Sequence, residues 1–254
     1  AAPANAISAS TANLYVLHAV PATPVDVWVN GTKTLTNFQP GTLTDALDLP
    51  AGDYSVVITA VGDPISSPVI GPATLPLVAG KSYTVVAHLD AAGAPTATLF
   101  ENDLSTIPAG QGKLTVRHTA AAPAVDILAN GAAAFTNLTN GNEVKANLPV
   151  GTISAAVAPA GTTTPVIGPA PVEIKEGVNT IVYAWGSLEA DNLDLAVQTI
   201  GGLHSNPGGV NSGQAGLAAD PNPAVVGFGI AGLLALLVVG GVLAVRARAA
   251  QANR

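Results

Sequence analysis

The sequence predicts an all-β protein, with two tandem immunoglobulin-like antiparallel β-sandwich domains followed by one C-terminal transmembrane α-helix. Three observations carry this prediction. First, the chain has 27 Gly, 20 Pro and only 4% aromatic residues, which suits thin β cores joined by frequent turns. Second, a long segment of the sequence occurs twice. Third, an uncharged apolar stretch lies close to the C-terminus.

The internal repeat is visible as matched residues in matched order. Residues 14–31 read LYVLHAVPATPVDVWVNG and residues 114–131 read LTVRHTAAAPAVDILANG. Further matches follow after short deletions, LPAG with LPVG and PVIGPA in both copies. These matches predict two homologous domains, repeat 1 (13–104) and repeat 2 (113–200), joined by a short linker (105–112) that lets them stack semi-rigidly.

Each repeat has the pattern of a series of short strands. In repeat 1, alternation with a period of two predicts strands at 14–18 and 25–29. Asn30-Gly31 is a strong type I′ turn signal and predicts a hairpin back along 33–35. The remaining strands are predicted at 43–47, 54–60, 72–77, 82–89 and 97–101. Seven or eight short strands at this spacing are typical of an antiparallel, immunoglobulin-like sandwich.

The chain after repeat 2 is predicted to form a stalk and a membrane anchor. Residues 201–223 are rich in Gly, Asn, Ser and Pro, which favours a flexible stalk. Residues 224–245 carry no charge, and as a helix they extend about 33 Å, enough to cross a bilayer core of about 30 Å. Arginines in the tail (246–254) place the C-terminus in the cytoplasm and the repeats outside the cell.

The glycines of the predicted span are candidates for helix–helix packing, because small residues let helices approach closely. They are Gly227, Gly229, Gly232, Gly240 and Gly241.

The N-terminal segment (1–12) is expected to follow a cleaved signal peptide. The chain has no Met and opens with Ala1-Ala2-Pro3-Ala4, a small-residue pattern typical of a cleavage site. With no Cys, an exported domain relies on its core and its backbone ladders. The abundance of Ala, Val, Gly and Pro is typical of a GC-rich source such as an actinobacterium.

The charge distribution limits the classes of partner that the protein can bind. All 16 acidic residues precede the predicted span, together with six of the nine basic residues, so the predicted ectodomain has a net charge of about −10 (6 minus 16). Such a surface disfavours nucleic acid and anionic lipid as partners. A solvated acidic surface is the default, with a divalent cation or a basic protein as alternatives.

Both repeats resemble the bacterial domain of unknown function 4397. The residues that carry the resemblance are His18, Val25, Asp26, Asn30, Gly31, Gly41, Leu49, Pro50 and Gly52, with their counterparts in repeat 2. The resemblance implies exported, often tandem, β-rich surface domains and no particular reaction. Repeat 2 departs from repeat 1 at the first hairpin, where 132–134 read AAA in place of TKT, and it has Trp185 in place of His88. These differences put a shared ligand site in doubt.

Two polar residues recur at matched positions, His18 with His118 and Asp26 with Asp126. One hypothesis is a metal or proton-transfer site in each domain, since imidazole and carboxylate suit either role. The other is structural: the His caps a loop and the Asp accepts backbone N–H bonds at a strand start. We favour the structural role because two ligands are too few for a tight metal site, and we predict no cofactor.

No enzyme motif is present in the sequence. It contains no Gly-x-Ser-x-Gly, no Cys nucleophile, no dinucleotide or phosphate loop and no calcium loop. An envelope hydrolase with two carboxylates that meet in space stays open as a separate class. The aromatic residues are expected to pack in the cores, with an exposed glycan-binding platform as the alternative: Trp28, Tyr54, Tyr83, Tyr183 and Trp185.

The favoured function is therefore a non-catalytic, membrane-anchored extracellular protein with a structural, adhesive or binding role in the cell envelope. Its partner would be an envelope protein or polymer. The alternative is an accessory single-span subunit of a larger membrane complex, such as a respiratory or transport assembly, which the glycines of the span favour.

Overall fold

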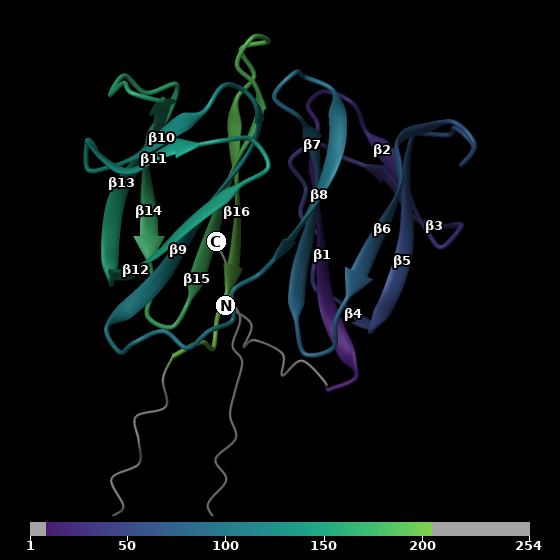
Figure 1. The fold of residues 1–254 in the computed structure, drawn as a ribbon, viewed down its shortest axis with the longest axis horizontal. Helices are drawn as coiled ribbons and strands as arrows, with labels where there is room; N and C mark the ends of the chain where they lie inside the picture. The colour runs from purple at the N-terminus through teal and green to yellow at the C-terminus, as the bar shows by residue number, and fades with distance from the viewer. Residues whose placement is uncertain (1–8, 205–254) are drawn as a thin grey trace, which may run out of the picture. The chain divides into compact units, whose positions relative to one another are not determined.

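Every regular element in the described part of the chain is a β-strand. The computed structural model describes residues 9–204 (Figure 1). The strands of repeat 1 are β1 (Thr11–Ala19), β2 (Val25–Val29), β3 (Thr32–Phe38), β4 (Leu47–Pro50), β5 (Gly52–Ala60), β6 (Pro68–Leu77), β7 (Ser82–Leu89) and β8 (Pro95–Glu101). The strands of repeat 2 are β9 (Gln111–Ala121), β10 (Val125–Ala129), β11 (Ala132–Leu138), β12 (Glu143–Pro149), β13 (Gly151–Pro159), β14 (Ile167–Ile174), β15 (Asn179–Ser187) and β16 (Asp194–Ile200).

The prediction of a membrane anchor falls outside this range. Between residues 9 and 204, no helix is long and apolar enough to cross a membrane. The predicted span at 224–245 with its five glycines, the tail, and most of the predicted stalk lie outside the described residues.

The two repeats fold into the same pair of four-stranded sheets. The sheet that we call inner has the order β4-β1-β7-β8 in repeat 1 and β12-β9-β15-β16 in repeat 2. The outer sheet has the order β3-β2-β5-β6 in repeat 1 and β11-β10-β13-β14 in repeat 2. The prediction of an all-β, sandwich-like architecture is confirmed.

One strand pair in each repeat departs from the predicted antiparallel pattern. β1 runs parallel to β7, from Asn13 opposite Ser82 to Ala19 opposite His88, and β9 runs parallel to β15. A parallel pair requires a long crossover. Here the chain passes through the whole outer sheet between the two strands, and local turn signals carry no information on such a distant pairing.

The local signals were accurate at the first hairpin and less accurate at β4. Asn30 and Gly31 have φ angles of 48° and 79°, as a type I′ turn requires, and repeat 2 has the same turn. The strand predicted at 43–47 lies instead at Leu47–Pro50. Its register against β1 points Leu47 and Leu49 toward the core, whereas Leu43 forms only an isolated bridge to Leu17.

Each sandwich has its own apolar core between its inner and outer sheets. The core of repeat 1 includes Leu14, Val16, Val27, Ile58, Leu75 and Val85. The core of repeat 2 includes Leu114, Val116, Ile127, Val157, Val172 and Val182. These side chains alternate along the strands, as a half-buried sheet requires.

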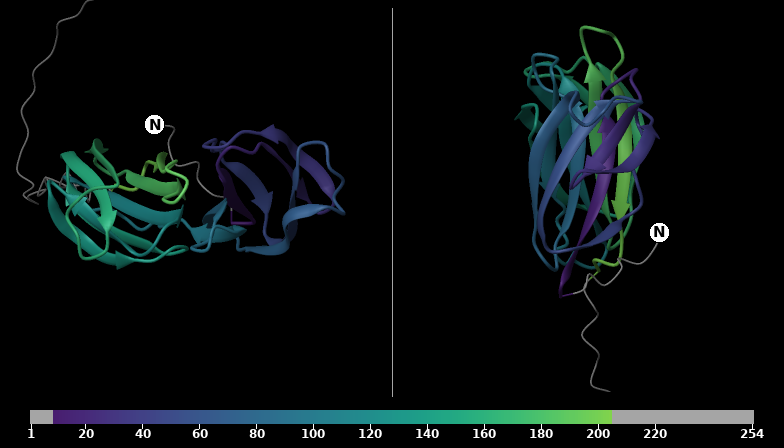
Figure 2. Two further views of the ribbon diagram at one scale, coloured as in Figure 1. Left: turned by 90° about the horizontal axis from the view of Figure 1, so that it is seen from above. Right: turned by 90° about the vertical axis from the view of Figure 1, so that its right-hand side faces the viewer.

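The central strands of the inner sheets are buried on both faces. In β7 and β15, consecutive residues are buried, so the side chains that point away from their own core are covered as well. They meet in a third apolar cluster, which we call the junction core. It contains Leu17, Ala19, Val86, Phe100 and Ile107 together with Ile181, Tyr183, Trp185, Ile200 and Leu203. The two inner sheets therefore pack on each other across the repeat boundary (Figure 2).

The linker and the start of the predicted stalk belong to this junction. Ile107 of the linker is fully buried, and its backbone N–H donates to the carbonyl of Leu203 at 2.7 Å. Leu203 is buried and its N–H donates to Gly177 at 2.9 Å, and His204 forms a bridge with Ile107. The flexible stalk predicted at 201–223 is thus wrong at 201–204, because Leu203 buries its side chain in the junction core.

Candidate functional site

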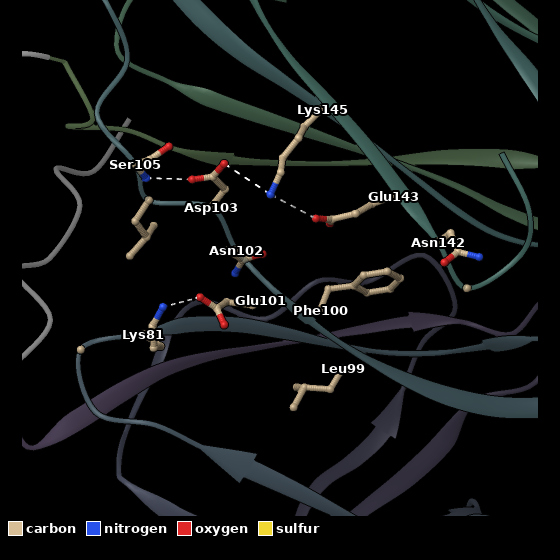
Figure 3. Close-up of a pocket in the computed structure, with 13 residues that line it drawn as sticks. Lys81, Leu99, Phe100, Glu101, Asn102, Asp103, Ser105, Asn142, Glu143 and Lys145 are labelled. Carbon is tan, nitrogen blue, oxygen red and sulfur yellow. Dashed lines mark hydrogen bonds and ion pairs between the residues drawn. The ribbon is translucent and has the colours of Figure 1, made fainter. Parts of the chain in front are cut away.

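A polar groove runs along the boundary between the repeats. It has a volume of about 780 Å³ and is lined by the end of β8, the residues that follow β8, the turn before β7 and the start of β12 (Figure 3). The lining residues are Gly80, Lys81, Leu99, Phe100, Glu101, Asn102, Asp103, Leu104, Ser105, Gly141, Asn142, Glu143 and Lys145. Both repeats contribute to it, so the groove exists only in the assembled pair.

The charged side chains of the groove are paired. Lys81 lies 2.6 Å from Glu101, with both side chains about half exposed. Lys145 of β12 reaches across to Asp103, which lies just before the linker, at 3.4 Å and also lies 3.7 Å from Glu143. Figure 3 shows these groups pointing toward one another along the groove. A ligand of matching polarity would find both donors and acceptors here, in alternation.

Asp103 fixes the linker to repeat 2. Its carboxylate accepts from the buried ammonium group of Lys113 at 2.8 Å and from the backbone N–H of Ser105 at 2.9 Å. Partial burial acts to raise the pKa of Asp103, but the hydrogen bonds from Lys113 and Ser105 outweigh it and hold the pKa well below its usual range. Asp103 is therefore ionised at neutral pH and the linker is anchored by charge as well as by Ile107.

Arg117 lies beside the groove and is fully buried. Its Nε donates to Glu143 at 2.8 Å, and its Nη1 donates to Asn102 at 3.0 Å and to the Tyr183 hydroxyl at 2.7 Å. Its guanidinium also lies 4.5 Å from the centre of the Phe100 ring, a cation–π contact. One side chain of repeat 2 thus binds two residues at the end of repeat 1.

Further hydrogen bonds cross the boundary. The Thr84 hydroxyl of β7 donates to the side-chain oxygen of Gln198 on β16 at 3.0 Å, with both residues buried. The side-chain amide of Asn140 donates to the carbonyls of Leu89 and Ala120 at 2.9 and 2.7 Å, one in each repeat. Buried polar groups need such partners, so these contacts fix the relative position of the two inner sheets.

These junction residues are not among those predicted from the sequence, although the sequence contains a signal for them. β9 reads QGKLTVRHTAA, and an Arg within an apolar run requires a buried partner or an exposed edge. The matched positions of repeat 1 hold Leu17, Val86 and His88 where repeat 2 holds Arg117, Tyr183 and Trp185. The two repeats therefore differ at the positions where their inner sheets contact each other.

The structure places the predicted His residues against loops. His18 is buried, and its Nε2 donates to the Thr23 carbonyl at 2.7 Å while its Nδ1 faces the backbone N–H of Val20 at 3.5 Å. His118 repeats this arrangement with Pro123 at 3.0 Å and Ala120 at 3.4 Å. Burial lowers the pKa of both imidazoles, although the hydrogen bonds to the carbonyls act in the opposite direction.

The predicted Asp residues lie in the outer sheets and accept backbone N–H bonds. Asp26 accepts from Asn37 at 2.9 Å and from Gly62 at 3.1 Å, and it pairs with Lys33 at 2.6 Å. The hydrogen bond from Lys33, followed by the two backbone bonds, lowers the pKa of Asp26 to about 2.

Asp126 makes the same two backbone bonds, to Asn137 at 2.8 Å and Gly161 at 2.9 Å. Position 133 is Ala, so repeat 2 has no counterpart of Lys33. Across residues 9–204, no three His, Cys, Asp or Glu side chains come together as a group that could hold a metal ion.

The aromatic residues divide between cores and surface contacts. Tyr83, Tyr183 and Trp185 are buried. Trp28 is half-buried, its indole N–H donates to the Thr59 hydroxyl at 3.1 Å, and Lys33 lies 4.7 Å over its ring. The Tyr54 hydroxyl donates to the carbonyl of Pro50 at 2.8 Å.

Comparison with known proteins matches part of the chain to a family without a known function. A family model described as "Domain of unknown function (DUF4397)" matches residues 12–128, which is repeat 1 and the first two strands of repeat 2. The resemblance predicted from the sequence is confirmed over these residues. No curated protein sequence matches the chain. A solved structure titled "The Bacillus anthracis TIE protein" is similar at 14% identity and a TM-score of 0.23, over 68% of this chain and 35% of that one.

Proposed function

We propose that this chain is a non-catalytic surface protein whose two sandwiches act as one rigid unit for structural or adhesive contact in the cell envelope. The observation that carries the proposal is the junction core with its buried polar contacts. Because Arg117 and Ile107 hold the repeats and the linker together, a force applied to one repeat would be transmitted to the other. A rigid pair of domains suits a spacer or a binding surface better than a flexible pair does.

The polar groove supports a binding role. It is formed jointly by both repeats, and its paired charges offer donors and acceptors to an envelope protein or a polar polymer. Its lining holds Lys, Asp, Glu and Asn side chains, without His or Cys and with Ser105 as its one hydroxyl-bearing side chain. Such a set suits recognition by hydrogen bonds and charge.

For the segments outside residues 9–204, the proposal rests on the sequence alone. Both repeats would be immunoglobulin-like domains of the same family, and the stretch at 224–245 would anchor them to the cell membrane with the short C-terminus in the cytoplasm. The source would be an actinobacterium, and a signal peptide would direct export.

Site-specific photo-cross-linking in the native envelope tests this function. A photoreactive amino acid placed at Asn142 in the groove is expected to capture an envelope protein or polymer. The same amino acid at the exposed Thr152 of the outer sheet is the matched control. Equal labelling at the two positions, or none at either, would argue against a binding groove.

The second candidate is an accessory single-span subunit of a larger membrane complex. It is favoured by the spacing of the small residues at 227–241, where two helices could approach closely. Gentle solubilisation followed by native gel electrophoresis distinguishes the two candidates. Migration in a stable high-mass complex supports the subunit role, and migration as a lone monomer rejects it.

A further inference from the structure

Each sandwich contains an apolar cavity between its inner and outer sheets. The cavity of repeat 1 has a volume of about 220 Å³, and Thr34 is the one polar residue among its lining residues. The cavity of repeat 2 also has a volume of about 220 Å³ and is lined by apolar residues alone. Protein interiors are normally packed to crystal-like density, and an empty apolar cavity lowers the free energy of unfolding. The two cavities lie at equivalent places in the two sandwiches.

The two cavities have equal volumes although their linings differ. Strand register pairs Val29 with Ala129, Leu47 with Ala146 and Val56 with Ala155, so repeat 2 has the smaller side chain three times. Repeat 2 instead has Phe135 in place of Leu35. In repeat 2, the side-chain volume lost at three positions is offset by the larger side chain at a fourth position. The two cavities therefore have the same volume.

Both cavities reach the edge where the two sheets of a sandwich end. In repeat 1 the lining includes Leu35 of β3 and Leu47 and Leu49 of β4, and all three side chains are only half-buried. β3 and β4 are edge strands, each hydrogen-bonded to one neighbour. Repeat 2 has the same arrangement at Phe135 of β11 and Leu148 of β12. The half-buried lining residues at these edges mark the place where an apolar molecule would enter.

From this geometry we infer that each sandwich binds one small, uncharged hydrocarbon, or one end of an alkyl chain, between its sheets. A dry apolar cavity of about 150 Å³ accepts benzene, so these cavities accept a group of about six to nine carbons. The lining offers no charge and, in repeat 2, no polar side chain, so the ligand binds by apolar contact alone. The source is either a free small molecule or the acyl chain of a membrane lipid.

Photoaffinity labelling of the full chain in lipid nanodiscs tests this inference. One arm adds an octanol analogue with a diazirine in its alkyl chain, and the other places the same diazirine in the acyl chain of the nanodisc lipid. Mass spectrometry of the peptides is expected to find label on β3 and β4 and on β11 and β12, and excess unlabelled octanol is expected to reduce it. The arm that gives label identifies the source.

A filled cavity provides the matched control. The variant Ala129→Val/Ala146→Leu/Ala155→Val gives repeat 2 the residues that repeat 1 already has and adds about seven carbon atoms (two, three and two). We expect label in repeat 2 to fall about tenfold or more while label in repeat 1 is unchanged. If the triple variant does not fold, Ala146→Leu alone is used. Label that is confined to the outer surface, or that persists in the filled repeat, would overturn the inference.

Discussion

The Nη1 atom of Arg117, on β9 of repeat 2, donates a 3.0 Å hydrogen bond to the side-chain oxygen of Asn102, which directly follows β8 of repeat 1. The same guanidinium contacts the Phe100 ring and the Tyr183 hydroxyl. A residue that is always charged is thus fully buried where the two repeats meet. We expect the stability of the junction to depend on Arg117.

Replacing Arg117 by Leu, the residue at the matched position of repeat 1, is expected to destabilise the chain. Asn102 and Tyr183 would lose a buried partner, whereas Glu143 can regain water because its side chain is 23% exposed. We expect the free energy of unfolding to fall by about 2–4 kcal/mol. Urea unfolding followed by tryptophan fluorescence measures it, since Trp185 lies in the junction core.

Lys175→Ala is the control for this variant. Lys175 pairs with Glu173 at 3.1 Å, but both side chains are more than half exposed, so its loss is expected to cost less than about 1 kcal/mol. Equal losses of unfolding free energy in the two variants would show that Arg117 stabilises the chain no more than an exposed ion pair does.

Asp26→Asn is expected to remove a pH-dependent part of the stability. The pKa of Asp26 is lowered from its ordinary value of 3.8 to about 2, so the ionised carboxylate stabilises the fold above the ordinary pKa, and this contribution is lost as the pH falls through about 2. At pH 7 the variant should be less stable than the native chain by about 1–2 kcal/mol. Urea unfolding at a series of pH values should show this difference shrinking between pH 5 and pH 2.

Lys33→Ala provides the comparison, because it gives repeat 1 the arrangement of repeat 2, where position 133 is Ala. It should reproduce part of the effect of Asp26→Asn and leave the backbone bonds to Asn37 and Gly62 in place. A stability difference that is constant with pH would contradict the role assigned to the carboxylate.

The buried imidazoles are expected to destabilise the fold in mild acid. Burial lowers the pKa of His18, His88 and His118 below the ordinary value of 6.5, so the unfolded chain takes up protons first as the pH falls. Their contribution is fully present above pH 6.5 and is lost as the pH falls toward the lowered pKa values. NMR titration of the imidazole signals measures these values directly. Midpoints at or above 6.5 would show that the imidazoles are not buried.

Gly71→Ala and Gly168→Ala are expected to damage the outer sheets. Gly71 has a φ of 97°, and a Cβ there would lie 2.6 Å from the carbonyl oxygen of Val56. For Gly168 the φ is 80° and the distance to the Ala155 oxygen is 2.8 Å. Both the left-handed backbone and the close contact are unfavourable, and we expect a loss of about 2–4 kcal/mol in each case.

Gly31→Ala separates these two causes. Gly31 has a φ of 79° but no atom within 4 Å of the added Cβ, so only the backbone penalty of about 1–2 kcal/mol applies. Thermal unfolding should rank Gly31→Ala as the mildest of the three. If all three variants unfold at the same temperature, the close contacts do not limit these positions.

Local sequence signals predicted the elements that depend on neighbouring residues. The Asn30-Gly31 turn, the strands on either side of it and the matched repeat all follow from residue types at short spacing. The PVIGPA motif is visible in the sequence as a repeat. The reason for its glycine is the close approach of Gly71 to the backbone of β5, and this approach is known only once the two strands are paired. Contacts of that kind are set by tertiary structure.

The junction could not be predicted because matched positions carry different residues there. Leu17 and Arg117 occupy equivalent positions in the two repeats but differ in their chemistry. A search for matched residues therefore identifies neither of them. The available signal was the unbroken apolar run of β15, which reads NTIVYAWGS and indicates a strand buried on both faces. One face of this strand packs in the core of repeat 2 and the other face packs in the junction core.

The central claim, that the two repeats form one rigid unit, is tested most directly by a distance measurement between them. The sequence has no Cys, so spin labels can be attached to Asp53→Cys on β5 and Thr152→Cys on β13, both exposed and both on outer sheets. Electron–electron double resonance on the full chain should give a single narrow distance distribution, which broadens when Arg117 is replaced by Leu. A broad distribution in the otherwise native chain would contradict the claim.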